Sequence, residues 1–480
     1  MKNDMPTVGM NTDITSLVDA MVAGNTDQMT GIARDLVAGG AGVSELIGRI
    51  GMLAAHGDSD GHVILTLAAA SMMARWFVSL QHLLGEDPLD HRPELPLLVQ
   101  AAAAATPAVQ AGSKKKDSYA EPLFPSGLPE GQTVNTMLTD AIFKGDAGMV
   151  ERLLFGLYGT GADYRTVCIR LYDSVSTTFQ QAGHPFMFAV RGFQLLDAVE
   201  WGTRAPNILH WLAPHIPVHT EEPTWVETVR IFLSESSHSL AGYRTRLAAP
   251  RDENALPLRR LILSDATMPQ ICQGVFDALI KNGASSRGIG SVLALTASDL
   301  LQRVTDDDGG AFVNAAHDLL FASAVRLALT QVQEVEALPL LFMAACYLHA
   351  LHAELPAQAA TGQPAATRSS ILGGGLIAPS LLETLGEQLN AQDLNGALAT
   401  ARRYLLLGHD ARAMFATIAL AAAQADTSAD QGHTLQITQA AGEEYMAWPV
   451  ALHNTNADGL LHVALRAVIF ARRNKLAANM

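Results

Sequence analysis

The chain has 480 residues, a formal net charge of −15 and 49% apolar side chains. This acidic balance argues against nucleic-acid binding, because neutralising phosphates requires clustered lysine and arginine. The basic run at 114–116 lies among Gly, Ser and Asp residues, and we interpret it as a solvated linker.

Abundant alanine and little β-branched alternation indicate a soluble, helix-rich protein. Cys168, Cys272 and Cys346 are isolated in the sequence and show no CxxC spacing, which predicts a reducing, cytoplasmic location and no cysteine zinc site. The first residues, MKNDMPTVGM, contain no apolar signal-peptide core, and we find no run of about eighteen uncharged apolar residues. We therefore expect neither export nor a membrane partner.

One order of elements recurs four times along the chain. Each copy has two or three helical stretches, then a polar break, then an apolar helix that carries a histidine. In three copies an interval of fifteen residues separates a polar helix start from a glycine: Asn25 to Gly40, Asp146 to Gly161, and Asp393 to Gly408. The interval from that glycine to the histidine is 22 residues in the first copy and 23 in the second.

A repeated unit of this kind cannot bury its apolar face alone, so neighbouring units must stack around a shared core. We predict an all-α fold, a helical repeat array of four similar units closing around a common core. The predicted boundaries are unit 1 at 1–111, a linker at 112–131, unit 2 at 132–250, unit 3 at 251–355, a linker at 356–370 and unit 4 at 371–480.

Each copy offers one candidate metal ligand: His62, His184, His317 and His433. Three of them directly follow a glycine at a helix start, whereas His317 lies about two turns inside its helix. The positive end of the helix dipole keeps such a ring neutral, and a neutral imidazole binds metals. If the units close around one axis, the four rings form a site suited to iron, copper, nickel or zinc. Alternatively, the glycine–histidine pair recurs because helix capping recurs.

Carboxylates near the histidines could orient the rings and offset the charge of a bound metal. Asp60, Asp318 and Asp430 are near enough in sequence for this role. As surface or capping residues they need no such role.

In the order and setting of its histidines, and in the segments GHPFMFAVRGFQLLD and TEEPTWVETVRIFL, the chain resembles the questin oxidase-like proteins. It is also similar to the helical region that accompanies a Rieske domain in some bacterial proteins. The resemblance covers most of the chain through short, degenerate motifs. It implies a non-haem iron oxygenase acting on a hydrophobic small molecule, polycyclic aromatic or quinone-like, with all four histidines on the iron.

The chain departs from the family pattern in two places. The helix of the last histidine can carry a lysine in such proteins, read as a carboxylated anionic ligand, and Gln436 stands near that position here. No C-x-H motif for a Rieske cluster is present, so electrons must come from a partner protein, a reductant or the substrate. Four neutral ligands also leave a divalent metal with its full charge, which favours an anionic or phenolate substrate.

The remaining histidines are interpreted more plainly. His349 and His352 share one face of a helix, but the pattern CYLHALHAEL favours a structural role in a buried helix. The others have no assigned role: His210, His215 and His219 around two prolines, and His453 and His462, which could line the same cavity or cap the last helix.

The leading hypothesis is a cytoplasmic, iron-dependent oxygenase with a hydrophobic small-molecule substrate and an electron-transfer partner. Gln436 keeps open a second hypothesis, a non-catalytic helical scaffold or binding protein derived from such an enzyme. A third is a cofactor-independent or haem-binding pocket that uses one of the histidines.

Overall fold

The computed structural model describes residues 13–84, 92–115, 118–161, 163–243, 251–305, 308–332, 335–355, 377–425, 430–449 and 457–478. Within these ranges the chain is helical, without any β-strand, and the predicted all-α class is confirmed. An isolated β-bridge pairs Arg251 with Ala284. The predicted linker at 356–370 lies outside the described residues.

The helices of the first half are α1 (Thr15–Ala23), α2 (Thr26–Ala38), α3 (Val43–Ala54), α4 (His62–Ala74), α5 (Phe77–Leu84), α6 (Leu95–Gly112), α7 (Val134–Phe143), α8 (Ala147–Gly159), α9 (Tyr164–Val175), α10 (His184–Val199), α11 (Ala205–His215) and α12 (Thr224–Ser234). Those of the second half are α14 (Pro257–Ile262), α15 (Met268–Phe276), α16 (Ser286–Leu301), α17 (Gly309–Gln331), α18 (Pro339–Glu354), α19 (Ala378–Asn390), α20 (Leu394–Leu406), α21 (Ala411–Ala423), α22 (His433–Met446) and α23 (Asp458–Ala478).

The polar helix starts noted in the sequence are side-chain caps. Asn25, Asp146 and Asp393 precede α2, α8 and α20, and each side-chain oxygen accepts the backbone N–H three residues later, at 3.1, 3.0 and 2.9 Å. Such a cap stabilises a helix by about 1 kcal/mol, because it satisfies an N–H that has no partner in the helix. Local chemistry therefore sets where these three helices begin.

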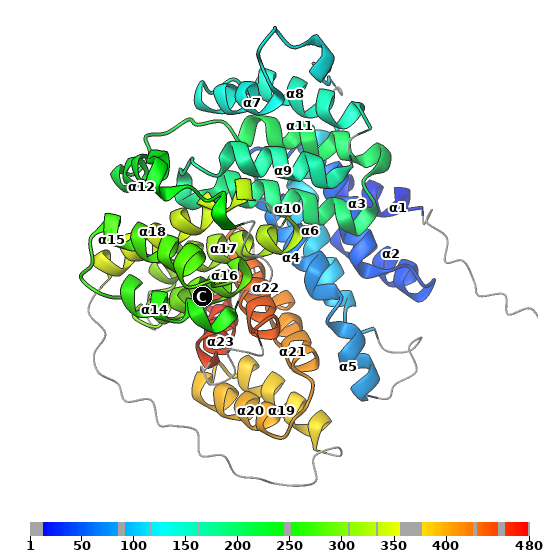
Figure 1. Ribbon diagram of the computed structural model, residues 1–480. Coiled ribbons are helices and arrows are strands. Elements are labelled where there is room, and N and C mark those ends of the chain that lie inside the picture. The colour runs from blue at the N-terminus through cyan, green and yellow to red at the C-terminus, as the bar shows by residue number, and fades with distance from the viewer. Residues whose placement is uncertain are drawn as a thin grey trace, which may run out of the picture.

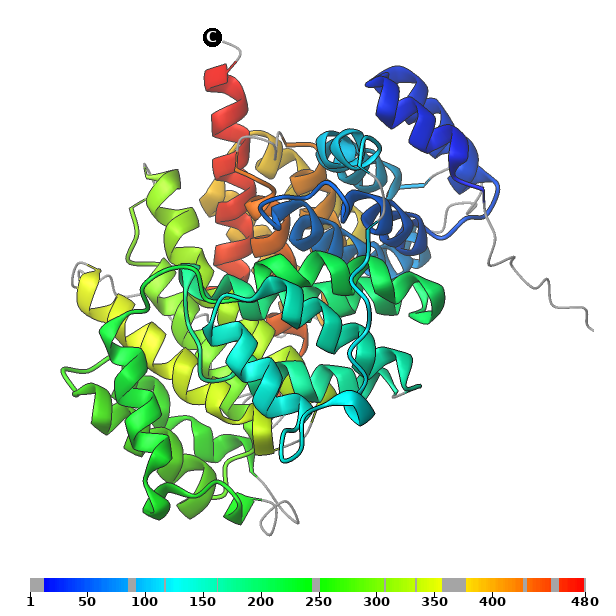
Figure 2. The same ribbon diagram turned by 90° about the horizontal axis from the view of Figure 1, so that it is seen from above.

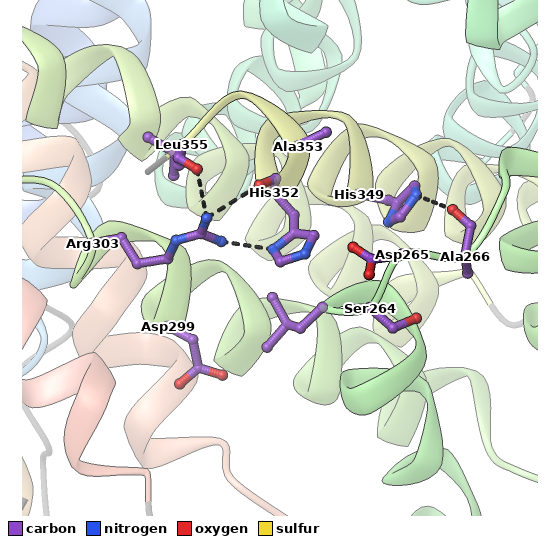
Figure 3. Close-up of a pocket in the computed structure, with 10 residues that line it drawn as sticks. Ser264, Asp265, Ala266, Asp299, Arg303, His349, His352, Ala353 and Leu355 are labelled. Carbon is purple, nitrogen blue, oxygen red and sulfur yellow. Dashed lines mark hydrogen bonds between the residues drawn. The ribbon is translucent and has the colours of Figure 1, made fainter. Parts of the chain in front are cut away.

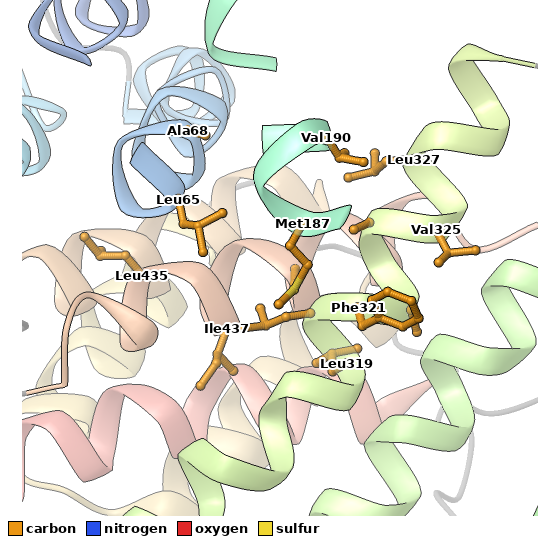
Figure 4. Packing of buried hydrophobic residues seen from close by; sticks show 14 of the residues in the cluster. Leu65, Ala68, Met187, Val190, Leu319, Phe321, Val325, Leu327, Leu435 and Ile437 are labelled. Atoms are coloured by element: carbon orange, nitrogen blue, oxygen red, sulfur yellow. The ribbon is translucent and has the colours of Figure 1, made fainter. Parts of the chain in front are cut away.

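Four helices form a closed ring at the centre of the molecule. α4 packs against α10, α10 against α17, α17 against α22, and α22 against α4 (Figure 1). They are apolar all round, as expected for helices covered on every side: in α10, 14 of 16 residues are buried. Leu65, Met187, Leu319 and Ile437, one from each helix, lie together in this core (Figure 4).

The other helices surround this ring. α1 to α3 and α6 pack outside α4, and α7 to α9 and α11 lie together outside α10 (Figure 1). α14 to α16 and α18 lie on the side of α17, and α19 to α21 and α23 on the side of α22. Seen from above, α23 projects from the body toward the C-terminus (Figure 2).

Three helical segments are long and apolar enough, by length and composition, to cross a membrane: His62–Leu84, Gly309–Gln331 and Val335–Glu354. In this fold 72%, 89% and 61% of their most apolar windows are buried against other helices. Core packing therefore accounts for their apolar character. The predicted cytoplasmic location and lack of a membrane partner stay predictions.

Two of the cysteines that are isolated in the sequence meet in the fold. Cys272 on α15 and Cys346 on α18 are buried free thiols, and their Sγ atoms lie 3.6 Å apart. The pairing arises because α15 and α18 pack side by side. Spacing along the chain could not reveal it.

Candidate metal centre

The four histidines predicted as ligands lie together where α4, α10, α17 and α22 converge. Their ring centroids follow one another in a closed cycle: His62 to His184 at 5.1 Å, His184 to His317 at 5.0 Å, His317 to His433 at 4.9 Å, and His433 to His62 at 5.3 Å. Each ring therefore has two other rings as neighbours. We call this group the histidine ring.

Three of the four histidines have nitrogens that lie close enough together to hold one ion. One nitrogen each from His62, His184 and His433 lie within 4.8 Å of one another. His317 is not in that triad, but its Nε2 lies 3.1 Å from Nε2 of His433. His184, His317 and His433 are buried, and His62 is half-buried.

Backbone carbonyls orient three of the four rings. Nδ1 donates to the carbonyl oxygen three residues earlier in each case: His184 to Gln181, His317 to Asn314 at 3.1 Å, and His433 to Asp430 at 2.5 Å. A ring with its hydrogen on Nδ1 has a lone pair on Nε2. Metal-binding histidines are held in this way by a hydrogen bond from the other nitrogen.

In His184, His317 and His433 the nitrogen left over after this contact is Nε2. Nε2 of His184 is buried without any partner, and Nε2 of His317 faces Nε2 of His433. Two lone pairs at that distance repel each other, whereas two ligands at about 2.1 Å from one ion lie about 3.0 Å apart at a right angle and about 3.4 Å apart at a tetrahedral angle. The 3.1 Å separation falls within that range. Burial lowers the pKa of His184, His317 and His433 to about 4, so these rings are neutral at pH 7, the form that binds metals.

The glycine before the histidine brings the helices into contact. Gly61, Gly183 and Gly432 have φ of 83°, 83° and 78°. A Cβ on each would overlap a side chain of the next helix in the ring, namely Phe188, Phe321 and Thr66 respectively. Each of these is the fourth residue after that helix's own histidine. The glycine–histidine pair is therefore a packing device that places one ring beside the next, and capping alone does not explain its recurrence.

Of the two alternatives for the nearby carboxylates, Asp318 and Asp430 follow the one in which they do not orient a ring, and backbone carbonyls hold His184, His317 and His433 instead. The carboxylate of Asp430 caps α22 through the N–H of Thr434 at 2.9 Å, and its backbone carbonyl holds His433. Asp318 is buried beside His317, but its Oδ1 accepts the N–H of Leu319 at 2.5 Å. A carbonyl one turn back lies within reach of Nδ1, so no side chain is needed.

The two aspartates before α4, Asp58 and Asp60, contact the start of that helix. Asp60 Oδ1 lies 3.5 Å from Nδ1 of His62 and accepts its backbone N–H at 3.1 Å. Asp58, which the sequence analysis missed, is buried and accepts the N–H groups of Gly61 and Ile64 at 3.1 and 3.0 Å. Burial raises its pKa to about 6. Asp58 therefore positions the start of α4; in the sequence it looked like one of several surface aspartates.

Gln436 does not point toward a ligand position. Its buried Nε2 donates to Oγ1 of Thr66 at 3.2 Å, and that hydroxyl donates to the carbonyl of His62 at 2.8 Å. Gln436 thus connects α22 to α4 beside the histidine ring.

The second histidine group, His349 and His352, lines a cavity of about 540 Å³ (Figure 3). Nδ1 and Nε2 of His349 lie 2.8 and 2.7 Å from the carbonyl oxygens of Ile262 and Ala266. Nδ1 of His352 lies 2.6 Å from Nη1 of Arg303. These nitrogens are engaged by the protein, which agrees with the structural role expected from the sequence.

The histidines without an assigned role lie elsewhere. His215 is separated from His184 by Phe188, whose ring centroid lies 5.2 Å from His215 and 5.5 Å from His184. His210 lies 2.6 Å from a carboxylate oxygen of Glu151. His453 lies outside the described residues.

No protein-family model, curated protein or solved structure matches this chain. The resemblance to the questin oxidase-like proteins therefore depends on the sequence motifs alone.

Proposed function

We propose that the chain is a metalloenzyme in which His62, His184, His317 and His433 bind one divalent transition metal. One observation carries the proposal: ring nitrogens of His62, His184 and His433 lie within 4.8 Å of one another, and Nε2 of His317 lies 3.1 Å from Nε2 of His433. A protein core rarely leaves buried lone pairs facing each other unless a cation completes the arrangement.

We further propose that the metal is iron and that the protein is an oxygenase. The resemblance supports this assignment, and imidazole is a suitable iron ligand. A bound iron would supply the chemistry of dioxygen. The protein contributes ring orientation through backbone carbonyls and an apolar surrounding that suits a hydrophobic substrate of polycyclic aromatic or quinone-like type.

The arrangement also supports the proposal that four similar units surround the metal. Each histidine comes from a different segment of the chain, and the caps at Asn25, Asp146 and Asp393 occur at matching places in three segments. An electron-transfer partner is part of the same proposal, because the sequence contains no Rieske motif.

Elemental analysis of protein purified without a histidine tag tests the metal. We expect close to one transition-metal ion per chain, and an anomalous-scattering peak between the four Nε2 atoms. Activity toward candidate aromatic substrates should require that ion. Metal-free protein that remains folded and active would sink the proposal.

Gln436 supports a second candidate function, a helical binding protein that has lost its chemistry. Its amide is committed to Thr66, so this helix offers no anionic ligand. This alternative predicts a histidine ring that takes up no metal even when iron, zinc or copper is supplied during refolding. Titrating the protein with each metal and measuring the heat of binding by calorimetry separates the two candidate functions.

A further inference from the structure

The cavity of about 540 Å³ beside His349 and His352 is formed by the outer helices. Its lining residues come from the segment 263–266 after α14, from the end of α16 and from the end of α18 (Figure 3). These residues do not belong to α4, α10, α17 or α22, so the cavity is separate from the histidine ring. Liquid water occupies about 30 Å³ per molecule, so the cavity is large enough for a small organic molecule.

Arg303 fixes the position of the hydrogen on one imidazole in this cavity. Its Nη1 lies 2.6 Å from Nδ1 of His352, and its Nη2 donates to the backbone carbonyls of His352 and Leu355 at 3.2 and 2.6 Å. Arginine has no acceptor, so Nδ1 accepts and the neutral ring carries its hydrogen on Nε2. Burial and the charge of Arg303 lower the pKa of His352, which keeps the ring neutral at pH 7. His352 therefore offers an N–H donor at Nε2, and no acceptor for it lies within the described ranges.

Asp265 provides the matching acceptor. It lines the same cavity, and within the described part of the chain its carboxylate makes no hydrogen bond or ion pair. The ring of His352 lies between the Arg303 guanidinium and Asp265 (Figure 3), and the charge of Asp265 acts on the pKa of His352. Since no direct hydrogen bond joins His352 to Asp265, a group that joins them has to accept from Nε2–H and donate to the carboxylate. A hydroxyl group does both.

The charges around the cavity oppose one another, which favours a neutral ligand. Asp299 accepts hydrogen bonds from Nε and Nη2 of Arg259, both at 2.7 Å. The charge of Asp265 is opposed by that of Arg303 on the other side of His352. A ligand with a net charge of either sign would therefore gain little from this lining. Leucine and alanine side chains complete the lining and provide contacts for C–H groups.

We propose that this cavity binds a neutral polyhydroxylated molecule, a sugar or a polyol. One hydroxyl, or two on adjacent carbons, accepts from Nε2 of His352 and donates to the carboxylate of Asp265. The C–H groups of the ligand pack against the leucine and alanine side chains, as in other small-molecule sites where a few polar groups fix the orientation. The site uses no residue of the histidine ring, so it stands or falls independently of the metal centre.

Isothermal titration calorimetry with glucose, galactose, xylose, myo-inositol and xylitol tests the class of ligand. We expect at least one of these probes to bind the wild type with a Kd of about 1 mM or below. If none of them binds at concentrations of about 20 mM, the inference is overturned. Binding of putrescine or malonate without binding of any sugar or polyol shows a charged ligand and also overturns it.

Asp265→Ala and His352→Phe test the two polar groups. Each should weaken the affinity for the bound probe about tenfold or more, because a hydrogen bond of the cavity is lost. Asp35→Ala, which removes an exposed aspartate of α2, is the matched control and should bind like the wild type. Wild-type affinity in either cavity variant overturns the inference. Should His352→Phe fold poorly, Asp265→Ala decides alone, since Asp265 is exposed and has no partner within the described ranges.

Crystals soaked in the tightest-binding probe locate the ligand. We expect a ligand hydroxyl within hydrogen-bond distance of both Nε2 of His352 and the carboxylate of Asp265. Density for water alone in this cavity, or for the probe at another place on the surface, overturns the inference. Metal analysis of the same protein reports on the histidine ring separately, because Asp265→Ala should leave the metal content unchanged.

Discussion

Among the described residues, the histidine ring and the pair His349 and His352 differ in how their nitrogens are used. In the histidine ring one nitrogen of His184, His317 and His433 is held by a backbone carbonyl, while the other faces neighbouring rings. In the second group both nitrogens of His349 contact carbonyl oxygens. The rings of the first group each keep one nitrogen that no carbonyl holds, whereas at His349 both nitrogens contact carbonyl oxygens.

This difference shows that burial and clustering alone do not mark a metal site. His349 and His433 are about equally inaccessible, at 7% and 4% exposure. What separates them is the hydrogen-bond inventory of each ring, which decides whether a nitrogen is left for a ligand. If a nitrogen without a protein partner is what marks a metal ligand, substitutions in the two groups should have different effects on metal binding and stability.

The largest expected effect is on metal content. His184→Ala should reduce metal affinity by about 100-fold or more, since even the outer hydrogen bonds of metal ligands contribute 10- to 100-fold. His349→Ala is the matched control and should retain the metal of the wild type, because its nitrogens are engaged by carbonyls. Elemental analysis after dialysis provides the measurement. Equal metal loss in both variants would show that the hydrogen-bond criterion fails.

The stability of the metal-free protein should depend on His349 more than on His433. His349→Leu removes the N–H that the ring donates to the carbonyls of Ile262 and Ala266 and leaves a buried carbonyl without a donor, which should lower the free energy of unfolding by about 1–3 kcal/mol. His433→Leu removes the contact between two lone pairs and should leave the free energy of unfolding of metal-free protein unchanged or raise it. Urea denaturation in the presence of a chelator measures both. A larger loss for His433→Leu than for His349→Leu would contradict the comparison.

Much of this comparison could be predicted from the sequence. The all-α class followed from the abundant alanine, the scarce β-branched alternation and the repeated helical unit, and the glycine–histidine pairs located His62, His184 and His433. His317 was found through the repeat, despite its position inside α17. These signals are local in the chain, so they can be read without coordinates.

The rest could not be predicted, for a physical reason. Every residue has a backbone carbonyl, so the sequence contains no sign that Gln181, Asn314 and Asp430 hold the rings and that aspartates do not. The buried ion pair of Arg326 and Glu444 joins residues 118 positions apart, and nothing local in the chain marks it. The contact of Cys272 with Cys346 spans 74 residues and depends on helix packing.

Substituting the glycine that precedes a histidine of the ring should have an effect of intermediate size. Gly432→Ala places a Cβ against Thr66 in a backbone conformation that side chains rarely adopt, and should lower the free energy of unfolding by about 2 kcal/mol. Metal affinity should fall as well, because the start of α22 moves away from α4. Gly386→Ala in α19, where a Cβ meets nothing, is the control and should stabilise by up to about 1 kcal/mol. If the double variant Gly432→Ala with Thr66→Ala regains part of the lost free energy of unfolding, the contact between the new Cβ and Thr66 is confirmed. If it regains none, the destabilisation has another cause.

The smallest expected effect concerns Gln436. Gln436→Leu should lower the free energy of unfolding by about 1 kcal/mol, the contribution of one buried hydrogen bond, because its amide connects α22 to Thr66 of α4. Metal content should not change, since the amide is committed to that hydroxyl and does not face the rings. Thr66→Val removes the same hydrogen bond together with the one that the hydroxyl donates to the His62 carbonyl, so it should destabilise at least as much and likewise leave the metal content unchanged. Loss of metal in Gln436→Leu but not in Thr66→Val would mean that Gln436 occupies the ligand position after all, and that the centre is not built from imidazoles alone.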